Sequence, residues 1–152
     1  MPNHGGLAER VEHLEDVNAI HELKARYARG IDNALRSPSA ANAAAFADLF
    51  TDDAVLDLGP AGRYEGKSAI LNAAETTFPA ATIWAAHHMV NPLIQVNGNH
   101  ATGQWYFLLY MQPAGTAGMP PVSAFGDYQE KYQKTPSGWK FKEVLGAFAF
   151  PK

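Results

Sequence analysis

The sequence predicts an α+β protein in which helices come first and a long antiparallel meander follows. Apolar residues recur at helical spacing near the N-terminus, two further short helices are indicated before residue 80, and alternating strands begin at Trp84. Helices that precede a run of adjacent strands are typical of folds in which the helices pack on one sheet. The 152 residues fit a single domain, with residues 1–14 as an N-terminal extension.

Three helices are expected. Apolar side chains at intervals of three or four residues predict the first over residues 7–33, with 15–16 as the candidate position of a break. Ser39 or Asn42 would cap a short second helix, since both side chains accept hydrogen bonds from the free N–H groups of a helix start. The third helix is expected to begin at residues 66–68.

Two short strands are expected between the helices and four long strands after them. The short strands are 54–60 and 62–65, and the long ones are 84–96, 101–112, 122–134 and 139–150. Asn97-Gly98 is a strong signal for a two-residue hairpin turn. Pro92 interrupts the first long strand, because proline cannot donate to a strand ladder. Side chains beyond it therefore need not keep the alternation of those before it.

The composition excludes several kinds of protein and site. With a net charge of −3 and twelve scattered Lys and Arg residues, the chain has no basic stripe for nucleic acid. No apolar run approaches the roughly 20 residues that span a bilayer, and the first residues lack a signal-peptide core, so a cytoplasmic protein is expected. The absence of cysteine excludes disulfides, cysteine-bound zinc and a thiol nucleophile.

His87 and His88 are the histidines best suited to chemistry, because their neighbours are apolar. On a strand their rings point to opposite faces, so both cannot bind one metal without a bulge, and no metal site is expected. The simpler interpretation is that either ring packs at the core edge against a backbone partner. No nucleotide-binding or nucleophile motif is present, so no cofactor is expected. What remains is acid–base chemistry by one histidine that a carboxylate orients.

Asp32 is the carboxylate best suited to orient a histidine. An aspartate near a helix C-terminus opposes the helix dipole, at a cost of about a few tenths of a kcal/mol, which invites a functional explanation; a solvated turn residue is the alternative. Tyr27 lies five residues earlier, about 140° away around a helix, and would converge with Asp32 if the helix ended at Gly30. Asp57 could reach the interior from its short strand, whereas Glu130 is expected to face solvent.

The long strands carry more aromatic residues than a layer of helices needs to cover. The excess predicts the lining of a cavity or an interface. The predicted substrate-binding residues are Trp105, Tyr106, Tyr110 and Tyr128, together with His88 and Asp57.

Three segments, taken together, resemble the SnoaL-like branch of the nuclear transport factor 2-like superfamily. They are EDVNAIHELKARYARGIDN, FADLFTDDAVLD and HHMVNPLIQVNGNHATGQWYFLLY. The resemblance spans about residues 15–148. It implies a cone-shaped, curved antiparallel sheet around three helices, an internal apolar pocket, and a homodimer or homotrimer. Family enzymes such as scytalone dehydratase, bile-acid 7α-dehydratase and hexachlorocyclohexane dehydrochlorinase use an Asp–His pair without a cofactor.

Matched by position, the resemblance assigns the catalytic pair to Asp32 and His87, because His87 stands four residues before Asn91. His88 takes the role if the alignment shifts by one residue. Tyr27 matches a tyrosine that polarises the substrate, and Tyr110 is the candidate for a second donor. The implied protein is a dehydratase-like lyase or isomerase that takes a proton from an apolar oxygenated molecule, such as a steroid, terpenoid or polyketide.

Two other functions remain open from the sequence. One is a non-catalytic binding or oligomerisation module, such as a β-subunit of a ring-hydroxylating dioxygenase. Another is an epoxide hydrolase, which needs a cation between two aspartates, from Arg26, Arg29 or Arg63. A hydrogen bond between Asp32 and a histidine ring nitrogen inside a cavity would favour the lyase or isomerase over the binding module.

Overall fold

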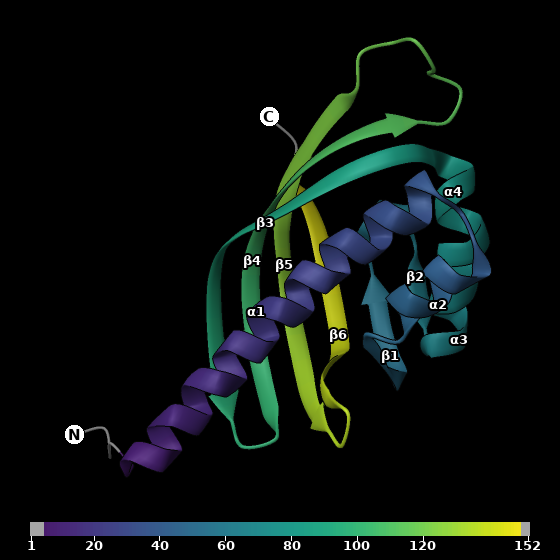
Figure 1. The fold of residues 1–152 in the computed structure, drawn as a ribbon. Helices are drawn as coiled ribbons and strands as arrows, with labels where there is room; N and C mark the ends of the chain where they lie inside the picture. The colour runs from purple at the N-terminus through teal and green to yellow at the C-terminus, as the bar shows by residue number, and fades with distance from the viewer. Residues whose placement is uncertain (1–4, 150–152) are drawn as a thin grey trace.

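The computed structural model describes residues 5–149 and has the predicted α+β fold, in which helices lie against one face of a curved sheet (Figure 1). The helices are α1 (Leu7–Arg36), α2 (Ala40–Ala47), α3 (Lys67–Asn72) and α4 (Phe78–Ala81), with a 3-10 turn at Gly59–Ala61 and a π-helical segment at Ala73–Thr77. The strands are β1 (Phe50–Asp57), β2 (Arg63–Glu65), β3 (Thr82–Asn97), β4 (His100–Pro113), β5 (Val122–Thr135) and β6 (Gly138–Ala149).

The sheet is mixed and does not close. Its strand order is β2-β1-β6-β5-β4-β3, so β2 and β3 form the two edges. The meander from β3 to β6 is antiparallel as predicted, but β1 pairs with β6 in parallel. No hairpin joins these two strands, so turn geometry does not fix their relative direction. Strand β1 also begins at Phe50, four residues before the predicted start at residue 54.

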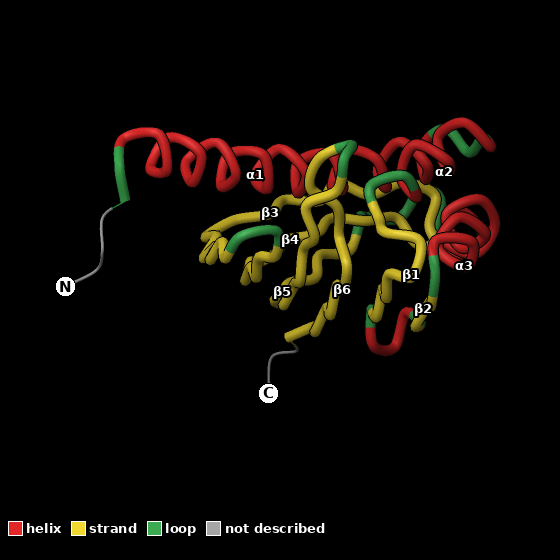
Figure 2. The backbone as a smooth tube through the Cα atoms, turned by 90° about the horizontal axis from the view of Figure 1, so that it is seen from below, coloured by secondary structure: helices red, strands yellow, loops and turns green. Residues whose placement is uncertain are grey.

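Helix α1 runs unbroken for 30 residues and ends at Arg36, three residues later than the sequence indicates. Its buried side chains begin at Asp16, whereas Leu7, Val11 and Leu14 are exposed on turns that extend beyond the sheet (Figure 2). The side chain of Ser39 accepts a hydrogen bond from the Asn42 N–H at 3.1 Å, so Ser39 is the cap of α2. Within residues 5–149, no helix is long and apolar enough to cross a membrane.

Strand β3 contains the irregularity expected at Pro92. Its pairing with β4 shifts between Val90 and Leu93, and Asn91 adopts a left-handed backbone with φ of 53°. The extra residue inverts the alternation: His87 and Met89 face the helices before it, but Ile94 and Val96 do so after it. Ile94 and Val96 therefore share a face with His87 and not with His88, as the interruption expected at Pro92 allows.

The core lies between the concave face of the sheet and the helices. Its largest fully buried aliphatic and phenylalanine side chains lie on α1, α2, β1, α3 and β6: Ile20, Phe46, Phe50, Leu56, Ile70, Phe141 and Val144. At the C-terminal end of α1 this packing leaves an unfilled space, which forms the candidate site.

Candidate active site

A pocket of about 400 Å³ opens between α1, α4 and the concave face of the sheet. Apolar side chains form most of its wall, from Ile31 and Leu35 on α1 to Phe107 and Leu109 on β4. The polar residues along it are Tyr27, Thr77, Thr82, His87 and Tyr128. A mostly apolar cavity of this size with a few polar groups is typical of small-molecule sites.

His87 and Asp32 are in direct contact at this pocket. Asp32 Oδ1 lies 2.6 Å from His87 Nδ1, and Asp32 Oδ2 accepts a hydrogen bond from the His87 backbone N–H at 3.1 Å. Both side chains are mostly buried, with 11% of His87 and 16% of Asp32 exposed. A carboxylate can only accept, so the imidazole proton lies on Nδ1 and the Nε2 lone pair is free. Asp32 therefore sets the tautomer and the orientation of the His87 imidazole, and it also holds the backbone of β3 at this residue.

The fold explains why this pair meets. Strand β3 is an edge strand, so backbone N–H groups on its outer side have no ladder partner. Helix α1 passes along this edge, and Asp32 supplies the acceptor that the N–H of His87 needs. Because α1 continues to Arg36, Asp32 lies within the helix and not at its end. Tyr27 accordingly points elsewhere, into the aromatic core of the pocket wall.

Tyr27 and Tyr128 form the opposite part of the pocket wall. Their rings meet edge-on, with centroids 5.9 Å apart, and both are almost fully buried. Burial raises the pKa of both phenols, so both hydroxyls are protonated at neutral pH. Both tyrosines line the pocket.

A buried polar chain beneath these tyrosines was not anticipated from the sequence. Glu130, expected at the surface, is only 3% exposed and binds Lys24 Nζ at 2.5 Å. Glu130 also accepts from the Tyr132 hydroxyl, and Tyr132 accepts from Trp105 Nε1 at 2.9 Å. Two signals could have revealed the chain: Lys24 follows Ile20 by four residues on the apolar helix face, and Glu130 alternates with two buried tyrosines.

Three of the predicted substrate-binding residues lie on the other face of the sheet. His88, Tyr106 and Tyr110 do not line the pocket of His87, and all are exposed, Tyr106 by 60%. His88 instead stacks edge-on with Tyr110, with centroids 6.3 Å apart. The physical reason is strand alternation, which puts His87 and Leu109 on the concave face and their chain neighbours on the convex one.

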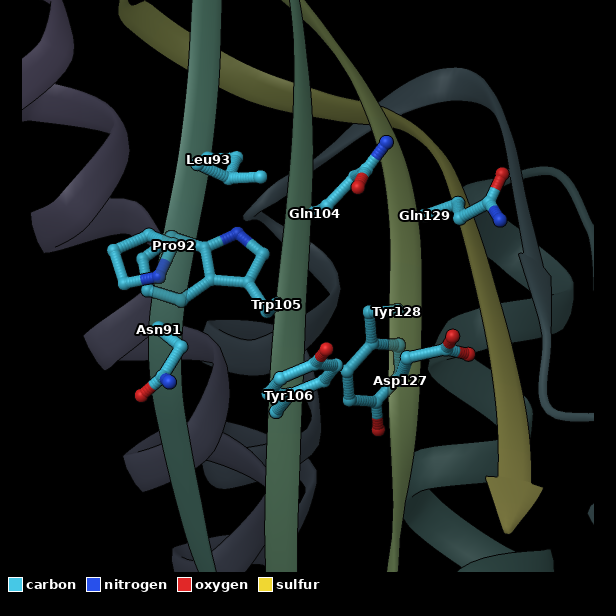
Figure 3. A pocket seen from close by; sticks show the side chains of 9 residues that line it. All are labelled: Asn91, Pro92, Leu93, Gln104, Trp105, Tyr106, Asp127, Tyr128 and Gln129. Carbon is cyan, nitrogen blue, oxygen red and sulfur yellow. The ribbon is translucent and has the colours of Figure 1, made fainter.

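Trp105 and Asp57 also lie outside the pocket. Trp105 is buried elsewhere in the core, and it borders a groove on the outer side of β3, β4 and β5 together with Tyr106 and Asp127 (Figure 3). Asp57 accepts from the Gly59 N–H and from Arg63, both at 2.9 Å, so it stabilises the turn after β1. Of the predicted substrate-binding residues, Tyr128 is the one that lines the pocket of His87.

Residues 5–149 contain no group of three or more His, Asp and Glu side chains arranged to hold a metal ion. In the Asp32–His87 pair, the ring Nε2 atom and the unused lone pairs of the carboxylate are the groups left to bind a ligand. The arrangement is therefore able to accept one proton from a molecule in the pocket.

Comparison with protein families identifies the chain. The model of the SnoaL-like domain matches residues 12–144, which is most of the sequence. The chain belongs to the SnoaL-like family. No curated protein sequence matches it significantly.

Solved structures place this SnoaL-like protein among NTF2-like folds. An NTF2-like protein with a cystatin-like fold from Novosphingobium aromaticivorans is 24% identical over 100% of this chain and 94% of its own, with a TM-score of 0.80. A suggested aromatic ring hydroxylase from the same species is 26% identical over 91% of this chain and 92% of its own, with a TM-score of 0.75. A type 2 hexachlorocyclohexane dehydrochlorinase is 19% identical over 93% of this chain and 90% of its own, with a TM-score of 0.79. The resemblance and the fold class predicted from the sequence are thus confirmed.

Proposed function

We propose that this SnoaL-like protein is a cofactor-independent lyase or isomerase in which His87 is the base and Asp32 orients it. The observation that carries the proposal is the contact of both Asp32 oxygens with His87, at the wall of an apolar pocket. The similarity of its fold to hexachlorocyclohexane dehydrochlorinase, an enzyme named for an elimination, adds support. The substrate we propose is an apolar oxygenated molecule such as a steroid, terpenoid or polyketide, since the pocket is largely apolar.

In this mechanism a C–H bond next to a carbonyl breaks, and its proton moves to His87 Nε2. The electron pair forms the enolate, whose oxygen accepts a hydrogen bond from the Tyr128 hydroxyl, with Tyr27 behind it. Asp32 stabilises the imidazolium that forms, because its carboxylate lies 2.6 Å from Nδ1. Collapse of the enolate then either expels a leaving group from the β carbon, which His87 can protonate, or returns the proton to another carbon. The first outcome is an elimination and the second an isomerisation.

The alternative is a non-catalytic binding module. The similarity of the fold to a suggested aromatic ring hydroxylase supports a role in a ring-oxidation system as the second candidate. Against it, a module that only binds has no need for a buried aspartate at hydrogen-bonding distance from a histidine ring. The epoxide hydrolase is not favoured, because Arg26 and Arg29 are exposed on α1 and Arg63 pairs with Asp57 outside the pocket.

The substrate class is tested first by a thermal-shift screen against steroids, terpenoid alcohols and polyketide-like ketones. A ligand at about 100 times its Kd adds about 2.7 kcal/mol to the free energy of unfolding. Hits are then incubated with the protein, and loss of water or double-bond migration is followed by mass spectrometry and NMR in D₂O. Exchange of a substrate C–H for deuterium would report proton removal even without net turnover.

His87→Ala and Asp32→Asn should each reduce turnover or exchange by at least about 100-fold, the low end for loss of a general base. His88→Ala is the matched control, since His88 lies on the opposite face, and should leave the rate within about twofold. Near-normal rates for His87→Ala or Asp32→Asn, with intact folding, would refute the dyad. Ligand binding without any exchange in the unmodified protein would favour the binding module.

The proposal also includes self-association and a cytoplasmic location. The outer face of the sheet carries exposed apolar side chains, among them Val90, Tyr106, Leu108, Tyr110 and Phe125. We expect a second copy of the chain to cover this face, as a homodimer or homotrimer, because apolar patches on a sheet commonly mark an interface.

A further inference from the structure

Lys24 is a fully buried cation whose place in the fold needs an explanation. It is 0% exposed on α1, and its ammonium bonds to Glu130 on β5, 106 residues away. A buried ion pair of this kind is often no more stabilising than apolar residues of the same volume, because both charges lose their hydration. Stability alone is therefore a weak reason for the pair.

The two ends of this pair face different surroundings. The Lys24 ammonium lies 3.7 Å from the centroid of the Tyr128 ring and 4.3 Å from that of Tyr27, and both of these residues line the pocket. The Glu130 carboxylate is bound on its other side by the Tyr132 hydroxyl, which in turn accepts from Trp105. The positive end of the pair thus lies against the pocket tyrosines. The Glu130 carboxylate, held by Lys24 and the Tyr132 hydroxyl, acts in the opposite sense and raises the pKa of both phenols, so the proposed effect depends on the ammonium being the nearer charge.

This arrangement has an electrostatic consequence at the pocket. A cation over the face of an aromatic ring attracts its π electrons, and charges act more strongly in a buried site than in water. The ammonium therefore favours negative charge on, or hydrogen-bonded to, the Tyr27 and Tyr128 hydroxyls. The other ring near it is Phe141, 5.7 Å away by centroid, which carries no competing polar group.

We propose that Lys24 is a positioning residue: held by Glu130 behind Tyr27 and Tyr128, it makes this wall of the pocket a binding site for the anionic oxygen of an enolate or phenolate. The inference rests on the proposed function, because it supplies the group that stabilises the enolate formed when His87 takes a proton. It is separable from it, since binding of a stable phenolate needs no turnover.

The probe is 4-nitrophenol, whose absorbance distinguishes the bound phenol from the bound phenolate. Titration with the unmodified protein across a pH series gives the pKa of the bound probe. We expect it to lie at least one unit below its value in water, which is a tenfold or larger preference for the phenolate. An unmodified protein that binds the probe without such a preference would overturn the inference.

Lys24→Met should reduce the ratio of phenolate affinity to phenol affinity by at least tenfold, and Tyr128→Phe should do the same. Lys24→Met leaves Glu130 unpaired, so the double variant Lys24→Met/Glu130→Gln provides a neutral, hydrogen-bonding replacement in case the single variant does not fold. Lys140→Met removes a lysine bound to Asp48 at the surface and serves as the matched charge control, with no expected effect on the ratio. A folded double variant with the full phenolate preference would contradict the role of Lys24.

His87→Ala separates the two proposals, because a protonated His87 could also attract an anion. Loss of turnover in His87→Ala with retained phenolate preference is the result expected if both hold. A preference that disappears in His87→Ala but persists without Lys24 would overturn the inference and leave the dyad intact. If the phenolate preference depends on Lys24 but turnover does not need His87, the dyad is refuted and the anion site at Tyr27 and Tyr128 stands.

Discussion

Gly126 marks the closest approach of β5 to its neighbours behind the pocket. A Cβ atom at this position would lie 1.9 Å from the carbonyl oxygen of Ala147 on β6 and 2.8 Å from Phe107 Cζ. The backbone oxygen cannot move aside without disturbing the ladder, and Phe107 is fixed by its edge-on contact with Phe148. Residue 126 must therefore be glycine, because Phe107 of the pocket wall and the backbone of β6 leave no room for a Cβ atom.

Gly126→Ala should lower the free energy of unfolding by about 1–3 kcal/mol, the usual cost of overpacking a core. Urea denaturation followed by circular dichroism measures it. Ser123→Ala, on the exposed part of the same strand, is the control and should change stability by less than about 0.5 kcal/mol. Equal stability of both variants would show that β5 and β6 can separate at no cost.

Asp32 and Glu130 differ in how much of their surroundings a local pattern reveals. Asp32 was identified because a carboxylate at the end of an apolar helix face lacks a local reason, and its partner His87 lies 55 residues away. Glu130 was placed at the surface because its polar neighbours in the sequence are exposed. Its own side chain alternates with them and meets Lys24 in the core. The alternation of Glu130 with two buried tyrosines indicates its burial, but a partner 106 residues distant cannot be identified from a local pattern.

Helix α1 is an element with two parts, and Asp16 separates them. Its Oδ1 accepts from Trp139 Nε1 at 2.7 Å on β6 and from Lys134 Nζ at 2.8 Å on β5. N-terminal to Asp16 the helix is exposed, and C-terminal to it the apolar face is buried against the sheet. Asp16 therefore fixes the point at which α1 docks, and through α1 the position of Asp32.

Asp16→Asn should destabilise the protein by about 1–2 kcal/mol at pH 7, through loss of charged hydrogen bonds. Burial acts to raise the pKa of Asp16, but the hydrogen bonds from Lys134 and Trp139 outweigh it, so the folded pKa is lowered. A lowered folded pKa means that this stability is complete above the unfolded value of about 3.9 and is lost as the pH falls through the folded value. The difference between the two proteins should therefore shrink below about pH 4.

Urea titrations at several pH values check this dependence. Glu12→Gln is the control, because Glu12 reaches Lys134 only at 3.6 Å from an exposed position, and it should change little at any pH. A difference between Asp16→Asn and the unmodified protein that persists unchanged at pH 3 would assign the effect to packing and not to charge.

At the scale of the whole molecule, the sheet has two faces with different chemistry. The concave face holds the pocket and the core, and the convex face carries Tyr106, Leu108, Tyr110 and Phe125 at the surface. The aromatic excess predicted to line a cavity or an interface is thus divided between the two faces. Tyr128 contributes to the pocket, and Tyr106 and Tyr110 contribute to the outer face.

Leu108→Glu should shift the protein towards the monomer, since it places a charge in the middle of the proposed self-association face. Sedimentation velocity measures the change in mass. Gln129→Glu is the control on the polar part of the same face and should keep the assembly. A monomeric unmodified protein, or an assembly that tolerates Leu108→Glu, would contradict association through this face.

The sequence by itself determined the order of the elements, the family, and the two residues that the structure brings into contact at the pocket. The order of the elements follows from local periodicity and from turn residues such as Asn97-Gly98, whereas the family and the pair follow from the resemblance, in which His87 stands four residues before Asn91. Only the tertiary structure decided the parallel pairing of β1 with β6, the face on which each aromatic ring lies, and the buried Lys24–Glu130 pair. These features depend on contacts between segments that are distant in the sequence, or on one extra residue that shifts the register of a strand. A local sequence pattern specifies neither the distant contacts nor the shift.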